Sequence, residues 1–247
     1  MMNLEEVFEK TLILIKECST LLKNTSQELD EQSKKDGTLI TKYDLIVDQK
    51  LTQELKKIVN YPILSEEHEE NIGDTYFVID PIDGTHNFSR GFEYFGIMVA
   101  FVEKEETLFS IIDMPMLNKT YTALKGKGAF LNGVRIYLKK RENRLIGNIN
   151  LSKQNCLEYI AKMMKSKYRF EFRSICSTGV SVCYVANGIL DFAIQIGRIG
   201  IWDIVPPKLI IEEAGGVCDV SKYDKEKYSI IAGEKELVET IKDMIYK

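Results

Sequence analysis

An acidic segment, residues 65–84, carries seven carboxylates and no Lys or Arg, and two of its members stand where carboxylates can do chemistry. Asp80 follows the apolar run 76–79, and Pro81 prevents simple continuation of that strand, so we expect the Asp80 carboxylate at a strand end. Asp83 precedes a Gly-Thr pair and is typical of a helix N-cap, where free backbone N–H groups can bind an anion. Two carboxylates about 4 Å apart repel by ~4 kcal/mol at an effective dielectric of about 20, and a divalent cation removes that repulsion. The segment therefore predicts a site for a cation and an anionic group.

The composition restricts the kind of cation. His68 and His86 are the only histidines, too few for a multi-His zinc site, and the five cysteines show no CxxC spacing. Oxygen ligands select Mg²⁺, Ca²⁺ or Mn²⁺, and a site that leaves room for waters and a substrate phosphate suits Mg²⁺. An EF-hand loop that begins at Asp80 fails, because Ile82 and Gly91 occupy its third and twelfth positions.

Other functional classes are disfavoured by charge and hydropathy. The net charge of −4 argues against a nucleic-acid partner. The acidic N-terminus and the short apolar runs argue against a secretory signal, a membrane span or a membrane partner. Scattered cysteines in odd number suit a reducing compartment, so we expect a soluble, cytoplasmic protein. The glycine-rich stretch 126–133 lacks the Lys and Ser or Thr of a phosphate-binding loop, and we interpret it as a hairpin turn.

Periodicity predicts the elements that must position these acids. Apolar residues at helical spacing predict a helix over the first two dozen residues and a second from near Asp44 with Leu45, Leu51, Leu55 and Ile58 on one face. Short apolar runs predict strands at 61–64, 75–79, 95–102, 107–114, 120–124, 145–150, 169–175, 190–196, 217–220 and 228–231. Further helices are expected at 155–164, 180–186, 202–214 and the C-terminus. This alternation predicts a layered α+β or mixed α/β fold in one domain, 1–247, with possible halves 1–140 and 141–247 divided by a charge shift near residue 140.

Four ordered motifs resemble those of the inositol monophosphatase superfamily, whose members are Mg²⁺-dependent and Li⁺-sensitive phosphatases. Residues 80–88, DPIDGTHNF, are similar to its DP[IL]DG[ST]xNF signature. Ser65-Glu66-Glu67 is similar to its GEE motif and Thr41-Lys-Tyr-Asp44 to its TxxD segment. Trp202-Asp203 with 213–216 is similar to its WD…EAGG helix. The resemblance implies the α-β-α-β-α sandwich of the sugar phosphatases.

The resemblance also implies a set of metal ligands. Glu66, Asp80 and the carbonyl of Ile82 would hold one Mg²⁺, and Asp80, Asp83 and Asp203 a second. A weaker third ion would share Glu66, and Mn²⁺ is a possible substitute.

The same resemblance assigns roles around the phosphate. Asp44 with Thr85 would orient and deprotonate the attacking water, with Glu66 assisting through the metal. The phosphate would lie on the backbone of Asp83, Gly84 and Thr85. A homodimer is implied by the family alone.

The substrate side departs from the pattern. Family members specific for inositol phosphate carry a Glu about seven residues before the WD aspartate, where this chain has Ile196, with Gln195 beside it. Arg198 is the nearest ionisable residue and favours a second phosphate or carboxylate. Ser177 and Thr178 are further candidates for the substrate pocket.

Three functions therefore stay open. The first is a phosphomonoesterase acting on inositol monophosphate or a similar small phosphorylated polyol. The second is the same chemistry on fructose 1,6-bisphosphate, a 3′(2′),5′-bisphosphate nucleotide or NADP. The third is a catalytically silent metal- or anion-binding protein, which the intact set of acids disfavours.

Two further positions carry structural expectations. Asp48 lies one turn beyond Asp44, and we expect it to be exposed or a local cap rather than a ligand. If Asp203 is the N-cap of its helix, Pro207 would delete an early helical hydrogen bond and distort the helix, whereas Pro206 would lose little.

Overall fold

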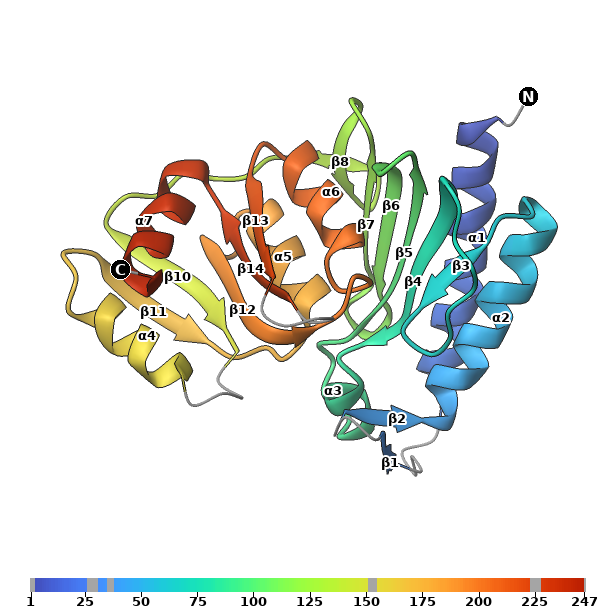
Figure 1. The fold of residues 1–247 in the computed structure, drawn as a ribbon, viewed down its shortest axis with the longest axis horizontal. Coiled ribbons are helices and arrows are strands. Elements are labelled where there is room, and N and C mark those ends of the chain that lie inside the picture. The colour runs from blue at the N-terminus through green and yellow to red at the C-terminus, as the bar shows by residue number, and fades with distance from the viewer. Residues whose placement is uncertain (1–2, 26–30, 35–37, 151–154, 223–227, 247) are drawn as a thin grey trace.

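A computed structural model describes residues 3–25, 31–34, 38–150, 155–222 and 228–246. Helices and sheets alternate in five layers, so the predicted mixed α/β sandwich is confirmed (Figure 1). The described strands form a seven-stranded sheet, a five-stranded sheet and a two-stranded ribbon. None of the helices in the described ranges is long and apolar enough to cross a membrane.

The seven-stranded sheet holds the first half of the chain. Two helices, α1 (Leu4–Lys23) and α2 (Lys42–Ile58), cover its outer face and bury Phe77, Phe101 and Phe109 against it. Its strands run in the order β3 (Ile63–Ser65), β4 (Thr75–Asp83), β5 (Gly96–Glu103), β6 (Glu106–Met114), β7 (Lys119–Leu124), β8 (Gly128–Leu131) and β9 (Val134–Ile136). The ribbon of β1 (Glu31–Ser33) and β2 (Leu39–Thr41), the short helix α3 (Thr85–Ser89) and the 3-10 helix η1 (Pro115–Leu117) complete this half. The stretch 126–133 forms turns and β8, as a hairpin requires.

The five-stranded sheet holds the second half. Its order is β11 (Arg169–Arg173), β10 (Arg144–Ile149), β12 (Phe192–Ile199), β14 (Tyr228–Gly233) and β13 (Val217–Lys222). Helices α5 (Thr178–Ala186) and α6 (Val205–Glu213) lie between the two sheets, whereas α4 (Asn155–Met164) and α7 (Lys235–Tyr246) cover the far face (Figure 1). The charged stretch near residue 140 connects β9 of the first sheet to β10 of the second along the chain. The division into halves remains a prediction.

Helix α2 is rotated relative to the expected face. Leu45 is 53% exposed, and the buried positions are Val47, Leu51 and Leu55 together with Asp48. The prediction that Leu45 lies on the core face was wrong, because it placed the buried face of the helix from the spacing of apolar residues alone. The buried face of this helix contains carboxylates.

Strand β4 continues four residues beyond the expected end at Ile79. Its pairing with β5 shifts register between Asp80 and Asp83, so Pro81 falls in a bulge where it has no ladder bond to donate. Because of this bulge, the side chains of Asp80 and Asp83 do not follow the regular alternation of side-chain directions along the strand.

The two prolines of α6 lie at its beginning. Ile204 is the N-cap, and Pro206 and Pro207 fall in the first turn, whose N–H groups have no intrahelical acceptor. Lys208 N–H donates to the carbonyl of Ile204 at 3.0 Å, and one turn earlier Val205 N–H donates to the carbonyl of Ile201 at 3.0 Å. Asp203 is not the N-cap, so the condition of the expectation does not hold, and the two prolines fall between these bonds, where neither has an N–H to donate.

Candidate active site

Three aspartates, two from β4 and one from 120 residues further along the chain, converge at the end of β4. Asp80 and Asp83 flank its bulge, and Asp203 precedes α6. One carboxylate oxygen from each lies within 4.8 Å of the others, so a single cation can contact all three. Oxygen donors at this separation suit a hard divalent cation.

Asp80 is the most isolated of these acids. It is 1% exposed, and its carboxylate accepts one backbone hydrogen bond, from Ile82 N–H at 3.0 Å. Burial raises its pKa well above the usual value, and the neighbouring Glu66 and Asp83 raise it further. Within the described residues no Lys or Arg forms an ion pair with Asp80. Its chemistry therefore fits a bound cation.

Asp83 is held by the start of α5 rather than by α3. Its carboxylate accepts hydrogen bonds from Thr178 N–H at 3.0 Å, from Gly179 N–H at 2.7 Å and from the Ser177 hydroxyl. A Cβ on Gly179 would lie 2.8 Å from the Asp83 carboxylate, so only glycine permits this approach. Burial raises the pKa of Asp83, and these hydrogen bonds oppose the shift. The N-cap of α3 is Gly84, so the prediction of Asp83 as that cap was wrong.

Asp44 and Thr85 meet behind the aspartate cluster. Asp44 closes a capping box at the start of α2, accepting from the N–H and hydroxyl of Thr41. The Thr85 hydroxyl lies 3.1 Å from the Asp44 carboxylate and 3.0 Å from the Ile82 carbonyl. Burial raises the pKa of Asp44, while hydrogen bonds from Thr41 and Thr85 lower it. Asp44 and Thr85 can therefore hold a group that donates a proton, such as a water, next to the three aspartates.

Glu66 stands at the other edge with a counter-charge of its own. The Lys34 ammonium lies 3.0 Å from Glu66 and 2.6 Å from Glu67. Burial nevertheless raises the pKa of Glu66 to about 7, opposed by Lys34. Lys34 was missed by sequence analysis, since it lies in a polar linker without a motif.

A cavity of about 730 Å³ joins these groups. The predicted residues that line it are Glu66, Asp80, Ile82, Asp83, Gly84, Thr85, Thr178 and Asp203. Asp44 contacts the cavity residue Thr85, and the Ser177 hydroxyl is directed at Asp83. The backbone of Arg198 lies in β12, and its side chain is outside the part of the chain that the structure describes.

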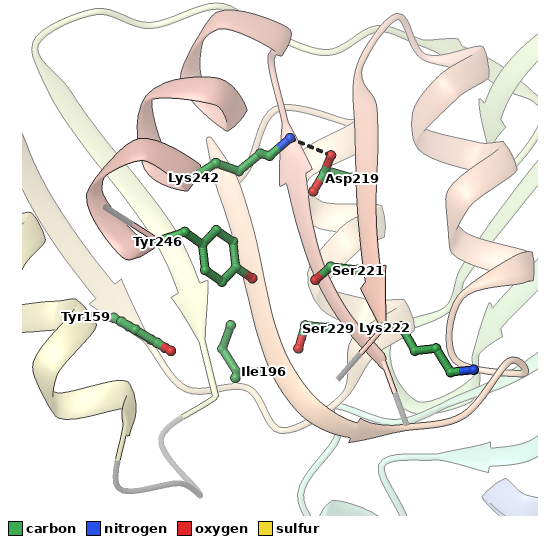
Figure 2. A pocket seen from close by; sticks show the side chains of 8 residues that line it. All are labelled: Tyr159, Ile196, Asp219, Ser221, Lys222, Ser229, Lys242 and Tyr246. Carbon is green, nitrogen blue, oxygen red and sulfur yellow. Dashed lines mark hydrogen bonds and ion pairs between the residues drawn. The ribbon is translucent and has the colours of Figure 1, made fainter. Parts of the chain in front are cut away.

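Strand β12 presents Gln195, not Ile196, to this cavity. Ile196 points to the opposite face of the sheet, where it lines a separate pocket of about 460 Å³ with Tyr159 and Tyr246 (Figure 2). The bulge between Gln195 and Ile199 explains why counting back from the WD motif is displaced by one residue. Gln195 is therefore the residue of this pair that faces the cavity.

Comparison with known proteins agrees with this architecture. A fructose-1,6-bisphosphatase/inositol-1-monophosphatase from Thermotoga maritima is 33% identical over 207 residues, which cover 81% of this chain and 80% of the relative. A 3′(2′),5′-bisphosphate nucleotidase CysQ from Aggregatibacter actinomycetemcomitans is 30% identical over 79% of this chain and 77% of its own. A solved IMPase/NADP phosphatase complexed with Mg²⁺ and phosphate shares the fold, with a TM-score of 0.86 at 20% identity over 97% of this chain and 95% of that one.

These similarities show that the protein is a phosphatase, that is, a phosphoric monoester hydrolase. The sequence profile of the Inositol monophosphatase family matches residues 3–244, and the chain belongs to that family.

Proposed function

We propose that the protein is a Mg²⁺-dependent phosphomonoesterase that acts on inositol monophosphate or a similar small phosphorylated polyol. The observation that carries the proposal is the buried cluster of Asp80, Asp83 and Asp203 in a cavity also lined by Gly84 and Thr85. Such a cluster is stable when cations neutralise it, and a phosphate is the anion that shares those cations. A silent binding protein would have no use for the Asp44–Thr85 pair beside it.

The residues present fit two or three bound ions. Glu66, Asp80 and the Ile82 carbonyl would hold one, and Asp80, Asp83 and Asp203 a second; a third would share Glu66, with Mn²⁺ as a substitute. Bound there, the ions would supply charge neutralisation and a water of lowered pKa. A neighbour of the same fold that is complexed with Mg²⁺ and phosphate supports the choice of these two ligands.

The chain's own groups would position the water and the phosphate. The Thr85 hydroxyl and the Asp44 carboxylate lie within one hydrogen bond of each other, so together they can orient a water and accept its proton. Backbone N–H groups at Gly84 and Thr85 would bind the phosphate oxygens. Gly84 adopts φ +94, and a Cβ there would lie 3.1 Å from the Tyr94 carbonyl, so this turn needs glycine.

The cavity wall favours a polyol. Gln195 offers a neutral amide that can donate to and accept from ring hydroxyls. The described Lys and Arg side chains of the wall, Lys34 and Arg90, are each paired with glutamate. The positive charge of each is therefore already compensated by a glutamate, so neither favours a second phosphate.

A bisphosphate is the second candidate. The two curated relatives are named for fructose 1,6-bisphosphate and for a 3′(2′),5′-bisphosphate nucleotide, and Arg198 lies three residues beyond Gln195 on β12. NADP is included because the solved neighbour is named an NADP phosphatase. A cytoplasmic location stays a prediction from the sequence composition, and a homodimer stays a prediction from the family resemblance.

The test is phosphate release with millimolar Mg²⁺, with and without Li⁺, from inositol 1-phosphate, fructose 1,6-bisphosphate, 3′-phosphoadenosine 5′-phosphate and NADP. We expect the highest kcat/KM with inositol 1-phosphate, inhibition by Li⁺, and no activity in EDTA. Release from none of the four would contradict an enzymatic role; preference for a bisphosphate would select the second candidate.

The two faces of β12 provide a matched pair of variants. Gln195→Ala removes a contact to substrate hydroxyls and should raise KM for inositol 1-phosphate about 10-fold. Ile196→Ala removes a buried side chain on the other face and should lower stability by about 2 kcal/mol with KM unchanged. Steady-state kinetics and urea unfolding separate the two effects, and equal KM values would remove Gln195 from the substrate site.

A further inference from the structure

Helix α2 carries a second buried carboxylate one turn beyond Asp44. Asp48 is 8% exposed, which corrects the expectation of an exposed residue or a local cap. One of its oxygens accepts from the Ser65 hydroxyl, and the other lies 2.8 Å from His68 Nδ1. Both partners belong to the turn that contains Glu66. A single carboxylate therefore attaches both ends of that turn to α2.

The turn is also closed by its own backbone. Ser65 N–H donates to the His68 carbonyl at 2.9 Å, and Glu67 N–H donates to the Ser65 hydroxyl oxygen at 3.2 Å. Glu66 N–H reaches the carbonyl of Ile79 on β4 at 3.3 Å. The Glu66 backbone is thus fixed on one side by β4 and on the other by Asp48.

The His68 ring has one nitrogen that is committed to Asp48. Its Nε2 is buried without a hydrogen-bond partner among the described residues. With Nδ1 donating to Asp48, Nε2 is a lone pair rather than an unsatisfied N–H donor. The imidazole therefore serves Asp48 as a single-point hydrogen-bond donor.

We propose that Asp48, acting with His68, is a positioning residue that sets the Glu66 carboxylate for the cation it shares with Asp80. The same helix places Asp44 against Thr85, so α2 holds two edges of the cavity at a fixed separation. Groups behind metal ligands of this kind contribute about 10- to 100-fold to metal affinity. The inference rests on the proposed metal-dependent function.

The test is Mn²⁺ binding without substrate, measured by electron paramagnetic resonance and calorimetry on the whole protein and on Asp48→Asn. Asparagine keeps the shape and removes an acceptor, so we expect the Kd of the ion at Glu66 to rise about 10-fold. Glu70→Gln is the matched control, because the Glu70 carboxylate ties the same loop to α2 through Lys56 and to β3 through Ile63 N–H, whereas no hydrogen bond joins it to residues 65–68. Its Mn²⁺ Kd should stay within about twofold of the unaltered protein.

A second variant keeps the inference testable if Asp48→Asn folds poorly. His68→Gln alone should weaken Mn²⁺ binding, and the double variant should bind no more weakly than Asp48→Asn, because His68 acts through its contact with Asp48. Urea unfolding of each variant shows whether weaker metal binding merely follows lower stability.

Two outcomes overturn the positioning role. One is an unchanged Mn²⁺ Kd in both Asp48→Asn and His68→Gln. The other is a loss of affinity that Glu70→Gln reproduces at equal stability loss. Failure of the proposed function is a different result: the unaltered protein would then bind no Mn²⁺ or release no phosphate.

Discussion

Two aspartates of the seven-stranded sheet are buried to the same degree, yet their surroundings differ. Asp113 on β6 is 2% exposed, and Lys16 Nζ forms an ion pair with it at 2.6 Å. The hydroxyls of Ser19 and Thr120 also donate to it. The protein itself therefore supplies both the counter-charge and the hydrogen-bond donors for this buried carboxylate.

Asp80, two strands away on β4, has only a backbone N–H in the same role. Its nearest charged neighbours are other acids, which raise its pKa rather than lower it. Burial of a carboxylate is thus common to a structural and a functional site. The missing counter-charge is what distinguishes the proposed functional site.

The largest expected difference is in activity. Asp80→Asn removes a proposed metal ligand and should lower kcat/KM by at least ~10²-fold, because even groups behind a ligand contribute that much. The same substitution should also raise the melting temperature of the metal-free protein, because a neutral amide replaces a buried carboxylate that other acids repel. Phosphate release and a melting curve in EDTA measure the two effects. Full activity in this variant would remove Asp80 from the site.

The corresponding change at the other aspartate should act on stability alone. Asp113→Asn weakens an ion pair and two hydrogen bonds, and we expect a loss of about 1–3 kcal/mol in the free energy of unfolding. The loss is limited because Lys16 is half exposed and can be hydrated again. Urea unfolding gives the value, and kcat/KM should stay within about twofold. A large loss of activity would mean that the two aspartates do not differ as described.

The smallest expected effect is a pH dependence confined to the acid cluster. The pKa of Glu66 is raised from 4.5 to about 7, so between these values the folded metal-free protein binds more protons than the unfolded chain. Its stability must then fall as the pH rises through this window. We expect the melting temperature in EDTA to be roughly 5 °C lower at pH 8 than at pH 5.5, since 1 kcal/mol shifts it by about 2–4 °C.

Saturating Mg²⁺ should remove this decline, because the cations stabilise the ionised acids. Glu66→Gln should reduce it in EDTA, whereas Asp113→Asn should leave its slope as it is. A decline that persists unchanged in Glu66→Gln would assign it to groups outside the cluster.

Local patterns predicted much of this molecule. Asp80 and Asp83 lie three residues apart in one motif. The alternation of predicted strands and helices along the chain was sufficient to predict the layered fold. The convergence of Asp203 with them rested on family resemblance, because no periodicity relates residues 120 positions apart. The role of each carboxylate remains a prediction.

Contacts between distant segments were not predictable. Asp48 was expected in solvent because its partners Ser65 and His68 lie 17 and 20 residues further along the chain. Gln195 and Ile196 could not be assigned to faces because the β12 bulge interrupts the two-residue repeat on which such an assignment depends.

The attachment of Asp83 to α5 has a consequence for how the protein is made. Its hydrogen-bond donors lie beyond residue 176, and Asp203 emerges from the ribosome later still. A nascent chain that has completed only the seven-stranded sheet therefore holds an incomplete set of ligands. Of the two proposed ions, the one at Glu66, Asp80 and the Ile82 carbonyl could therefore bind once the first sheet has formed, whereas the one at Asp80, Asp83 and Asp203 could bind only after residue 203 has been synthesised.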